Sequence, residues 1–140
     1  MDFATLTTFH RGNASSPYGK HYALLPYPQY VFPWLAKRWQ ELAPPELAEI
    51  VQAERIERYI EADGIVFEDH ALQTHQVQFS RHPQRGFFGS STYSLRGPDE
   101  TDIPPGQLSV RQQLVLLSQL AFYTGVGYKT TMGMGQLRVR

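Results

Sequence analysis

The chain has 140 residues, no cysteine, and 13 lysine and arginine side chains balanced by 13 aspartate and glutamate side chains. This length suffices for one domain with a hydrophobic core, the lack of cysteine excludes disulfides and thiolate metal sites, and the zero net charge argues against tight, sequence-blind binding to nucleic acid. The sequence shows neither a secretory signal nor a long uninterrupted apolar segment, so we expect a cytoplasmic protein with no membrane partner.

The charges are unevenly distributed along the chain. Nine of the 13 acidic residues lie between Glu41 and Asp69, whereas most basic residues lie outside that stretch. If the fold preserves this separation, one face of the molecule is acidic and another is basic.

The first part of the chain predicts a strand and two helices. Residues 3–10 are rich in threonine and phenylalanine and predict a strand, and the polar stretch 11–20 predicts a loop. Apolar residues at helical spacing predict a helix over 28–42, with Pro33 at its start or at an early kink. Two prolines end this helix, and residues 46–57 suggest a second, short and acidic helix.

The middle of the chain changes to a period of two, which is typical of strands. The runs are 59–67, 75–79 and 87–95, and residues 81–86 predict a hairpin connection with a basic tip between the last two. The proline-rich stretch 97–106 predicts a surface loop.

The last part predicts a helix, a turn and a closing strand. Ser109 and Gln112 have the spacing of a capping box, and the apolar positions that follow predict a helix with a broad buried face. Gly125 stands where a helix favours a left-handed residue. Residues 135–140 alternate apolar and basic side chains and predict a closing strand with its charges on one face.

The order of elements predicts the fold class. Strand, helix, strands, helix and strand match an α+β, ferredoxin-like βαββαβ sandwich, with two helices on one face of an antiparallel sheet. We expect residues 1–140 to form one such domain, with an extra strand, a short acidic helix and a C-terminal glycine-rich loop.

Four of the 11 glycines lie in that loop, as Gly-Val-Gly at 125–127 and Gly-Met-Gly at 133–135. A dinucleotide fingerprint and a phosphate-binding P-loop both need glycines ahead of a helix, whereas these follow one. A helix cap with a tight turn explains Gly125 and can extend to Gly127, but it leaves Gly133 and Gly135 unexplained.

This paired pattern resembles the C-terminal glycine-rich loop of the RAMP superfamily of CRISPR-associated proteins, and within it the endoribonuclease that processes CRISPR precursor RNA. The likeness extends to residues 25–28, 38–39, 86–89 and 120–127. The resemblance implies two tandem ferredoxin-like domains, metal-free cleavage within RNA repeats, no cofactor, and delivery of a guide RNA to an interference complex. It identifies this chain with the C-terminal domain, so an N-terminal domain or second subunit is an expected partner alongside CRISPR repeat RNA.

In that family the catalytic histidine generally lies in the N-terminal domain, which the chain is too short to include. Of the five histidines, His21 is the candidate for local catalysis, although its neighbours in an extended chain point to opposite sides. We interpret His10 and His70 as surface residues and His75 as a sheet residue. No pair of histidines has metal-ligand spacing, so no metal site is predicted.

The loop is the predicted RNA-binding site. Its amides and side chains would hold phosphates, Tyr128 would stack on an unpaired base, and further basic residues would brace the loop or extend the contact along a repeat stem. The predicted RNA-binding residues are Gly125, Val126, Gly127, Tyr128, Lys129, Thr130, Thr131, Gly133, Met134, Gly135, Arg38, Arg81, His82 and Arg85. The alternatives are a non-cleaving RAMP subunit that binds guide RNA, and a ferredoxin-like module for protein association.

Overall fold

The structure is a computed structural model that describes residues 1–13, 15–79 and 82–140. In chain order its elements are β1 (Asp2–Thr7), β2 (Phe9–Arg11), β3 (His21–Ala23), α1 (Pro28–Leu42), α2 (Pro45–Ala48), α3 (Ala53–Glu61), β4 (Ile65–Phe79), β5 (His82–Leu95), α4 (Val110–Thr124), a 3₁₀ turn η1 (Thr130–Met132) and β6 (Leu137–Arg138).

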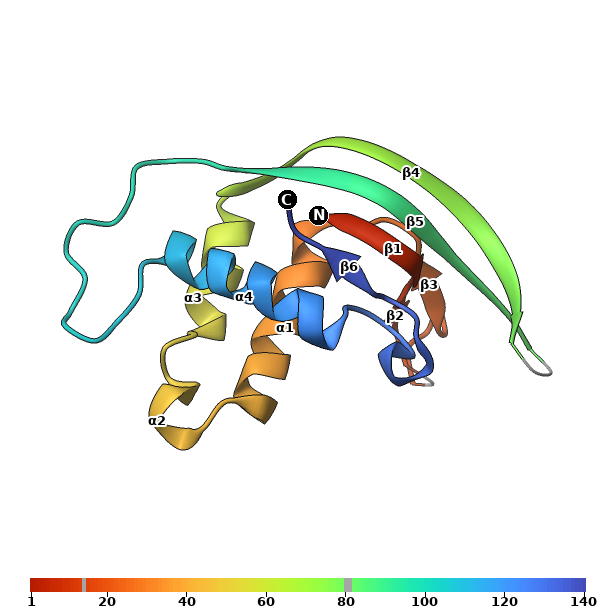
Figure 1. Ribbon diagram of the computed structural model, residues 1–140, viewed down its shortest axis with the longest axis horizontal. Coiled ribbons are helices and arrows are strands. Elements are labelled where there is room, and N and C mark those ends of the chain that lie inside the picture. Colours follow the sequence, from red (N-terminus) through yellow and green to blue (C-terminus); the bar gives the residue numbers. More distant parts are fainter. Residues whose placement is uncertain (14, 80–81) are drawn as a thin grey trace.

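Four strands form an antiparallel sheet in the order β4-β5-β1-β6. In chain order these are the second, third, first and fourth strands of a βαββαβ unit, which is the ferredoxin-like arrangement and confirms the predicted fold class. Figure 1 shows α1, α3 and α4 on one side of this sheet. Strands β2 and β3 form a separate two-stranded ribbon between β1 and α1.

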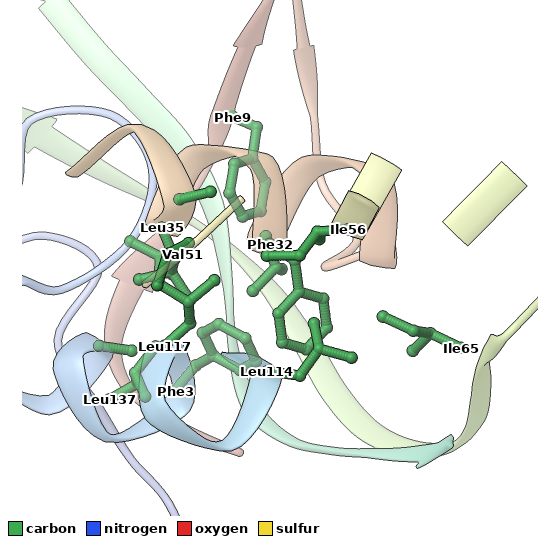
Figure 2. Close-up of a cluster of buried hydrophobic side chains, with 14 of the residues drawn as sticks. Phe3, Phe9, Phe32, Leu35, Val51, Ile56, Ile65, Leu114, Leu117 and Leu137 are labelled. Carbon is green, nitrogen blue, oxygen red and sulfur yellow. The ribbon is translucent and has the colours of Figure 1, made fainter. Parts of the chain in front are cut away.

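The hydrophobic core lies between the sheet and the helices (Figure 2). Leu35 of α1 and Leu117 of α4 are fully buried, and the Phe3 and Phe87 rings of the two central strands meet edge to face with centroids 5.1 Å apart. Each such aromatic side chain stabilises the fold by roughly 1.5–3 kcal/mol through burial. Val126, two residues after the end of α4, belongs to this core, so the core holds the start of the glycine loop in place.

The predicted first helix is confirmed as α1 with the bounds Pro28–Leu42, and Pro33 lies inside it and not at its start. The acidic segment differs from the prediction, because it forms two helices, α2 and α3, instead of one. Val51 between them is only 1% exposed, so burying this side chain requires the chain to turn inward there. The amide of Gln52 donates to Oε1 of Gln113 on α4 at 2.8 Å and holds that turn.

The predicted strand over 59–67 is wrong in its first half. Tyr59 belongs to α3, and its ring packs against Gly64, where a Cβ atom would lie 2.4 Å from it. The second half and the 75–79 run join into the single 15-residue strand β4. The hairpin connection is also shorter than predicted, because Phe79 already pairs with His82.

The two ends of the chain differ in smaller ways. The predicted first strand is divided into β1 and β2, and β2 leaves the main sheet to pair with β3, so the extra structure is a ribbon. The closing strand β6 is only two residues long. The capping box is confirmed, with Ser109 Oγ accepting from the Gln112 amide at 3.1 Å and the Gln112 side chain accepting from the Ser109 amide at 2.9 Å.

Candidate nucleic-acid interface

The glycine loop is fastened along β1. The Gly135 amide donates to the Leu6 carbonyl at 3.0 Å, and the Tyr128 amide donates to the Thr8 carbonyl at 2.8 Å. The Val126 amide donates across the loop to the Gly135 carbonyl at 2.9 Å. These bonds close the base of a lobe whose outer part is residues 128–133.

Close backbone contact explains the glycines at the base of the lobe. A Cβ atom on Gly127 would lie 2.4 Å from the Thr8 carbonyl oxygen, and one on Gly135 would lie 2.0 Å from the Val126 carbonyl oxygen. No larger residue fits such spacing without moving backbone. Gly125 has the expected positive φ of 67°, but its ψ of −172° differs from the left-handed helical cap predicted, because the chain turns at once into the lobe.

Five of the predicted RNA-binding residues are therefore buried and hold the lobe in place: Gly125, Val126, Gly127, Met134 and Gly135. The accessible part consists of half-buried residues 128–130 and exposed residues 131–133. The Thr5 hydroxyl steadies this part by donating to the Gly133 carbonyl at 2.9 Å.

Lys129 lies at the first bend of the lobe in an unusual backbone conformation. Its φ of 57° and ψ of 35° are left-handed, which is uncommon for a residue other than glycine, asparagine or aspartate. Its carbonyl accepts from the amide of Met132 at 2.9 Å and from that of Met134 at 3.4 Å. Its ammonium lies 5.3 Å from the centroid of the Tyr128 ring, so the bend presents a cation beside an aromatic ring.

His10 stacks on Tyr128. The two rings are nearly parallel, at 4°, with centroids 4.2 Å apart, and the Tyr22 ring lies 4.7 Å from His10. Burial against these rings lowers the pKa of His10, and the charges of Lys20 and Lys129 lower it further. The lowered pKa favours the neutral form of His10, whose stacking on Tyr128 joins the β2–β3 ribbon to the lobe.

A hollow of about 320 Å³ opens between β2, α1 and the lobe. Its cationic lining residues are Arg11 and Lys37, beside His10, and none of the described residues that line it is acidic. Much of the remaining surface is aromatic or apolar. The full lining is Phe9, His10, Arg11, Gln29, Tyr30, Pro33, Trp34, Lys37, Gly127 and Tyr128.

Two arginines lie over aromatic rings of α1 at this hollow. The Arg11 guanidinium is 4.8 Å from the Tyr30 ring centroid, and that of Arg38 is 4.8 Å from the Trp34 ring centroid. Arg38 also forms an ion pair with Glu41 at 2.7 Å. Its contacts therefore support Trp34, one of the residues that line the hollow.

The remaining candidate residues lie elsewhere. His82 and Arg85 are exposed on β5, near the projecting end of the long β4–β5 hairpin (Figure 1), and Arg81 lies outside the described residues. His21 is exposed on β3 opposite Arg11 and does not line the hollow.

Two other histidines have ring partners. His75 is exposed on β4 and contacts the Phe88 ring at 4.8 Å, as expected of a sheet residue, and His70 stacks on Phe67 at 5.3 Å. Among the described residues, no group of three or more histidine, aspartate or glutamate side chains is arranged to hold a metal ion. The described helices also include none that is long and apolar enough to cross a membrane.

Sequence reasoning missed the ribbon and the α1 residues of the hollow. His10 is exposed, as predicted, but its stacking on Tyr128 was not expected, because the contact of β2 with the lobe joins segments more than 100 residues apart. One signal was available: Arg11, Lys20 and Lys37 are three cations outside the acidic stretch, interleaved with tyrosines. This composition is typical of nucleic-acid surfaces.

The strand order defines a ferredoxin-like domain, and the cationic, aromatic hollow belongs to the class of surfaces that suit nucleic acid. The family model of the CRISPR-associated endoribonuclease Cas6 matches residues 1–137, so the chain belongs to the Cas6 family. This match confirms the family that the glycine pattern predicted. A comparison with curated protein sequences found no match.

Solved Cas6 structures are similar over nearly the whole chain. A Cas6 product complex is 28% identical with a TM-score of 0.69, covering 96% of this chain and 47% of that one. Thermus thermophilus Cas6 is 29% identical with a TM-score of 0.65, covering 96% and 49%. A second Cas6 product complex, at 24% identity and a TM-score of 0.68 over 99% and 49%, supports the fold alone. The chain thus spans about half the length of these structures.

Proposed function

We propose that this chain is the RNA-binding half of a Cas6 endoribonuclease, which processes CRISPR precursor RNA by metal-independent cleavage within its repeats. The outer lobe, residues 128–133, and the neighbouring β2–β3 ribbon bind the repeat RNA. Membership in the Cas6 family supports a role in RNA processing, and the similarity to a Cas6 product complex supports RNA binding by this half.

One observation carries the proposal: the lobe and the ribbon bring cations and aromatic rings together at one end of the molecule. Lys20 and Lys129 are both close enough to His10 to lower its pKa, so their charges share one region. Cations neutralise phosphates, and rings stack on bases in single-stranded RNA. Both kinds of group are present here within a few ångströms, as the Tyr128 contacts show.

The chemical step is assigned to a group outside this chain. Metal-free RNA cleavage needs a base for the 2′-hydroxyl proton and an acid for the leaving oxygen. His10 is stacked on Tyr128 and close to Tyr22, and His21 is exposed on β3 and does not line the hollow, so we assign the proton transfers to neither. We therefore assign to this half the binding and orientation of the RNA.

Lys129 provides the direct test. Lys129→Gln removes the charge at nearly constant size, and Arg58→Gln on α3 removes a charge far from the lobe as a control. With a short repeat RNA, fluorescence anisotropy over a series of salt concentrations should show weaker binding by Lys129→Gln and a salt slope reduced by roughly one unit. Lys129→Arg should restore most of the affinity. Equal affinity and slope for Lys129→Gln and Arg58→Gln would remove the lobe from the RNA site.

The non-cleaving RAMP subunit and the protein-association module remain the alternatives. RNA binding without cleavage in EDTA, after an N-terminal Cas6 half has been supplied, favours the first. The second draws support from exposed aromatic residues on α4, where Phe122 is 52% and Tyr123 81% exposed. The protein-association module is favoured if the protein purifies free of nucleic acid and shows no affinity for repeat RNA.

A further inference from the structure

We infer that the hollow between β2, α1 and the lobe is a binding site for one unpaired nucleotide, with its base stacked on Trp34. The inference rests on the proposed RNA binding and goes beyond it by separating base binding in the hollow from phosphate binding on the lobe. The volume of about 320 Å³ suits a small planar ligand and lies at the lower end of the range of ligand pockets.

The ring contacts favour Trp34 as the stacking platform over Tyr128. Tyr128 is already stacked on His10 and has the Lys129 ammonium beside its ring. Trp34 lines the hollow, and the Arg38 guanidinium lies over its indole. The Glu41 carboxylate holds Arg38 in place, so the part of Trp34 that lines the hollow is supported for stacking on a base. Base stacking on an aromatic ring tolerates any base, because every base has a π-face.

The charge of the hollow favours a nucleotide over an apolar peptide side chain. Arg11 and Lys37 line it, and no described lining residue is acidic. Lys37 is exposed, and within the described part of the chain its ammonium has no ion-pair partner. A base inside the hollow therefore leaves its phosphate near these two cations, at the rim that leads to the lobe.

Pro33 adds a hydrogen-bond acceptor at the wall. A proline has no amide hydrogen, so it cannot donate to the carbonyl four residues earlier, which is that of Gln29. Both residues line the hollow. The Gln29 carbonyl therefore lacks this helical donor and can accept a hydrogen bond from a base edge. The Gln29 side-chain amide is a second polar group that can contact a base stacked on Trp34.

The test compares two fluorescently labelled probes of equal length and charge, a hexa-adenylate RNA and a base-free ribose-phosphate hexamer. A Trp39→Phe background leaves Trp34 as the sole tryptophan, because the chain has two. Hexa-adenylate should quench Trp34 emission, and the base-free hexamer should not. Trp34→Leu should weaken hexa-adenylate binding about tenfold and leave binding of the base-free hexamer unchanged.

Trp34 is partly buried against the core, so Trp34→Leu can disturb folding, and a second variant at an exposed position tests the hollow independently. Lys37→Gln on the exposed rim should weaken binding of both probes equally, and Arg58→Gln should affect neither. Equal affinity for the two probes without quenching overturns the nucleotide site and leaves the proposed function standing. Binding of neither probe, together with no binding of repeat RNA, contradicts both.

Discussion

Gly133 and Gly135 lie two positions apart and both have a positive φ, but the space around their Cα atoms differs. At Gly133, where φ is 85°, a Cβ atom would meet nothing within 4 Å. At Gly135, where φ is 70°, it would lie 2.0 Å from the Val126 carbonyl oxygen. Gly133 is therefore required only for its positive φ. Gly135 is required for its positive φ and also for the close contact with Val126 that closes the base of the lobe.

Alanine substitution separates the two effects. Gly133→Ala should lower the free energy of unfolding by about 1–2 kcal/mol, which is the usual cost of a left-handed alanine. Gly135→Ala should lower it by roughly a further 1–3 kcal/mol, because backbone must move to admit the methyl group. Urea unfolding followed by circular dichroism measures both. Equal losses would mean that the Val126–Gly135 contact is looser than the structure shows.

Side-chain contacts between residues close in the sequence were predictable, whereas contacts between distant segments were not. The capping box at Ser109 was identified from two residues three positions apart. The stack of His10 on Tyr128 was not, since it depends on how β2 leaves the main sheet. The αL conformation of Lys129 was not predicted either, because the sequence alone favours glycine for that conformation.

At the scale of elements, the period of apolar residues predicted the bounds of helix α1 better than the bounds of strand β4. The bounds of α1 followed from its apolar spacing and flanking prolines. The alternation over 59–67 misled, because Tyr59 and Ile60 pack on the core from the last turn of α3 and not from a strand. The 15-residue length of β4 was missed, because His70 to Gln78 are largely exposed and show no strict alternation of apolar residues.

Helix α4 leads directly into the lobe, so its first turn should matter for the stability of the site. Ser109→Ala removes the acceptor for the Gln112 amide and should lower the melting temperature by several degrees, from a loss of about 1 kcal/mol. Ser118→Ala is the matched control in the same helix. Its hydroxyl donates back to the Leu114 carbonyl at 2.8 Å, a contact that contributes little.

Differential scanning calorimetry compares the two serine variants. A melting temperature that falls equally in both, or in neither, would contradict the assigned role of the cap. RNA affinity at a temperature well below melting should be unchanged in both, because neither serine lines the hollow or the lobe.

At the scale of the whole molecule, exposed glutamates gather on α2 and α3, although α3 also carries Arg55 and Arg58. The acidic helices α2 and α3 lie at the opposite end from the ribbon and the glycine loop (Figure 1). Glu46, Glu54 and Glu57 are exposed at the first end, and the Lys20 and Lys129 charges act together at the second. Under the proposed function, these charges guide an RNA toward the lobe and repel it from the glutamates of α2 and α3, although the net charge of the chain is zero.

The fold class and the family were both predictable from the sequence, because element order and the paired glycines are local features that survive folding. Only part of the surface that we propose for RNA was predictable from the sequence. The lobe was identified from its glycines, but the hollow beside it needs β2 and α1 to meet the lobe, and only the folded chain shows that contact.

The most direct test of the account is to locate bound RNA by crosslinking. A repeat RNA that carries 4-thiouridine at unpaired positions is irradiated on the intact chain, and the modified peptides are identified by mass spectrometry. We expect crosslinks at Trp34 or Tyr30 in the hollow and at Tyr128 in the lobe. Crosslinks confined to α3 or to the outer face of α4, with those three residues unmodified, would contradict it.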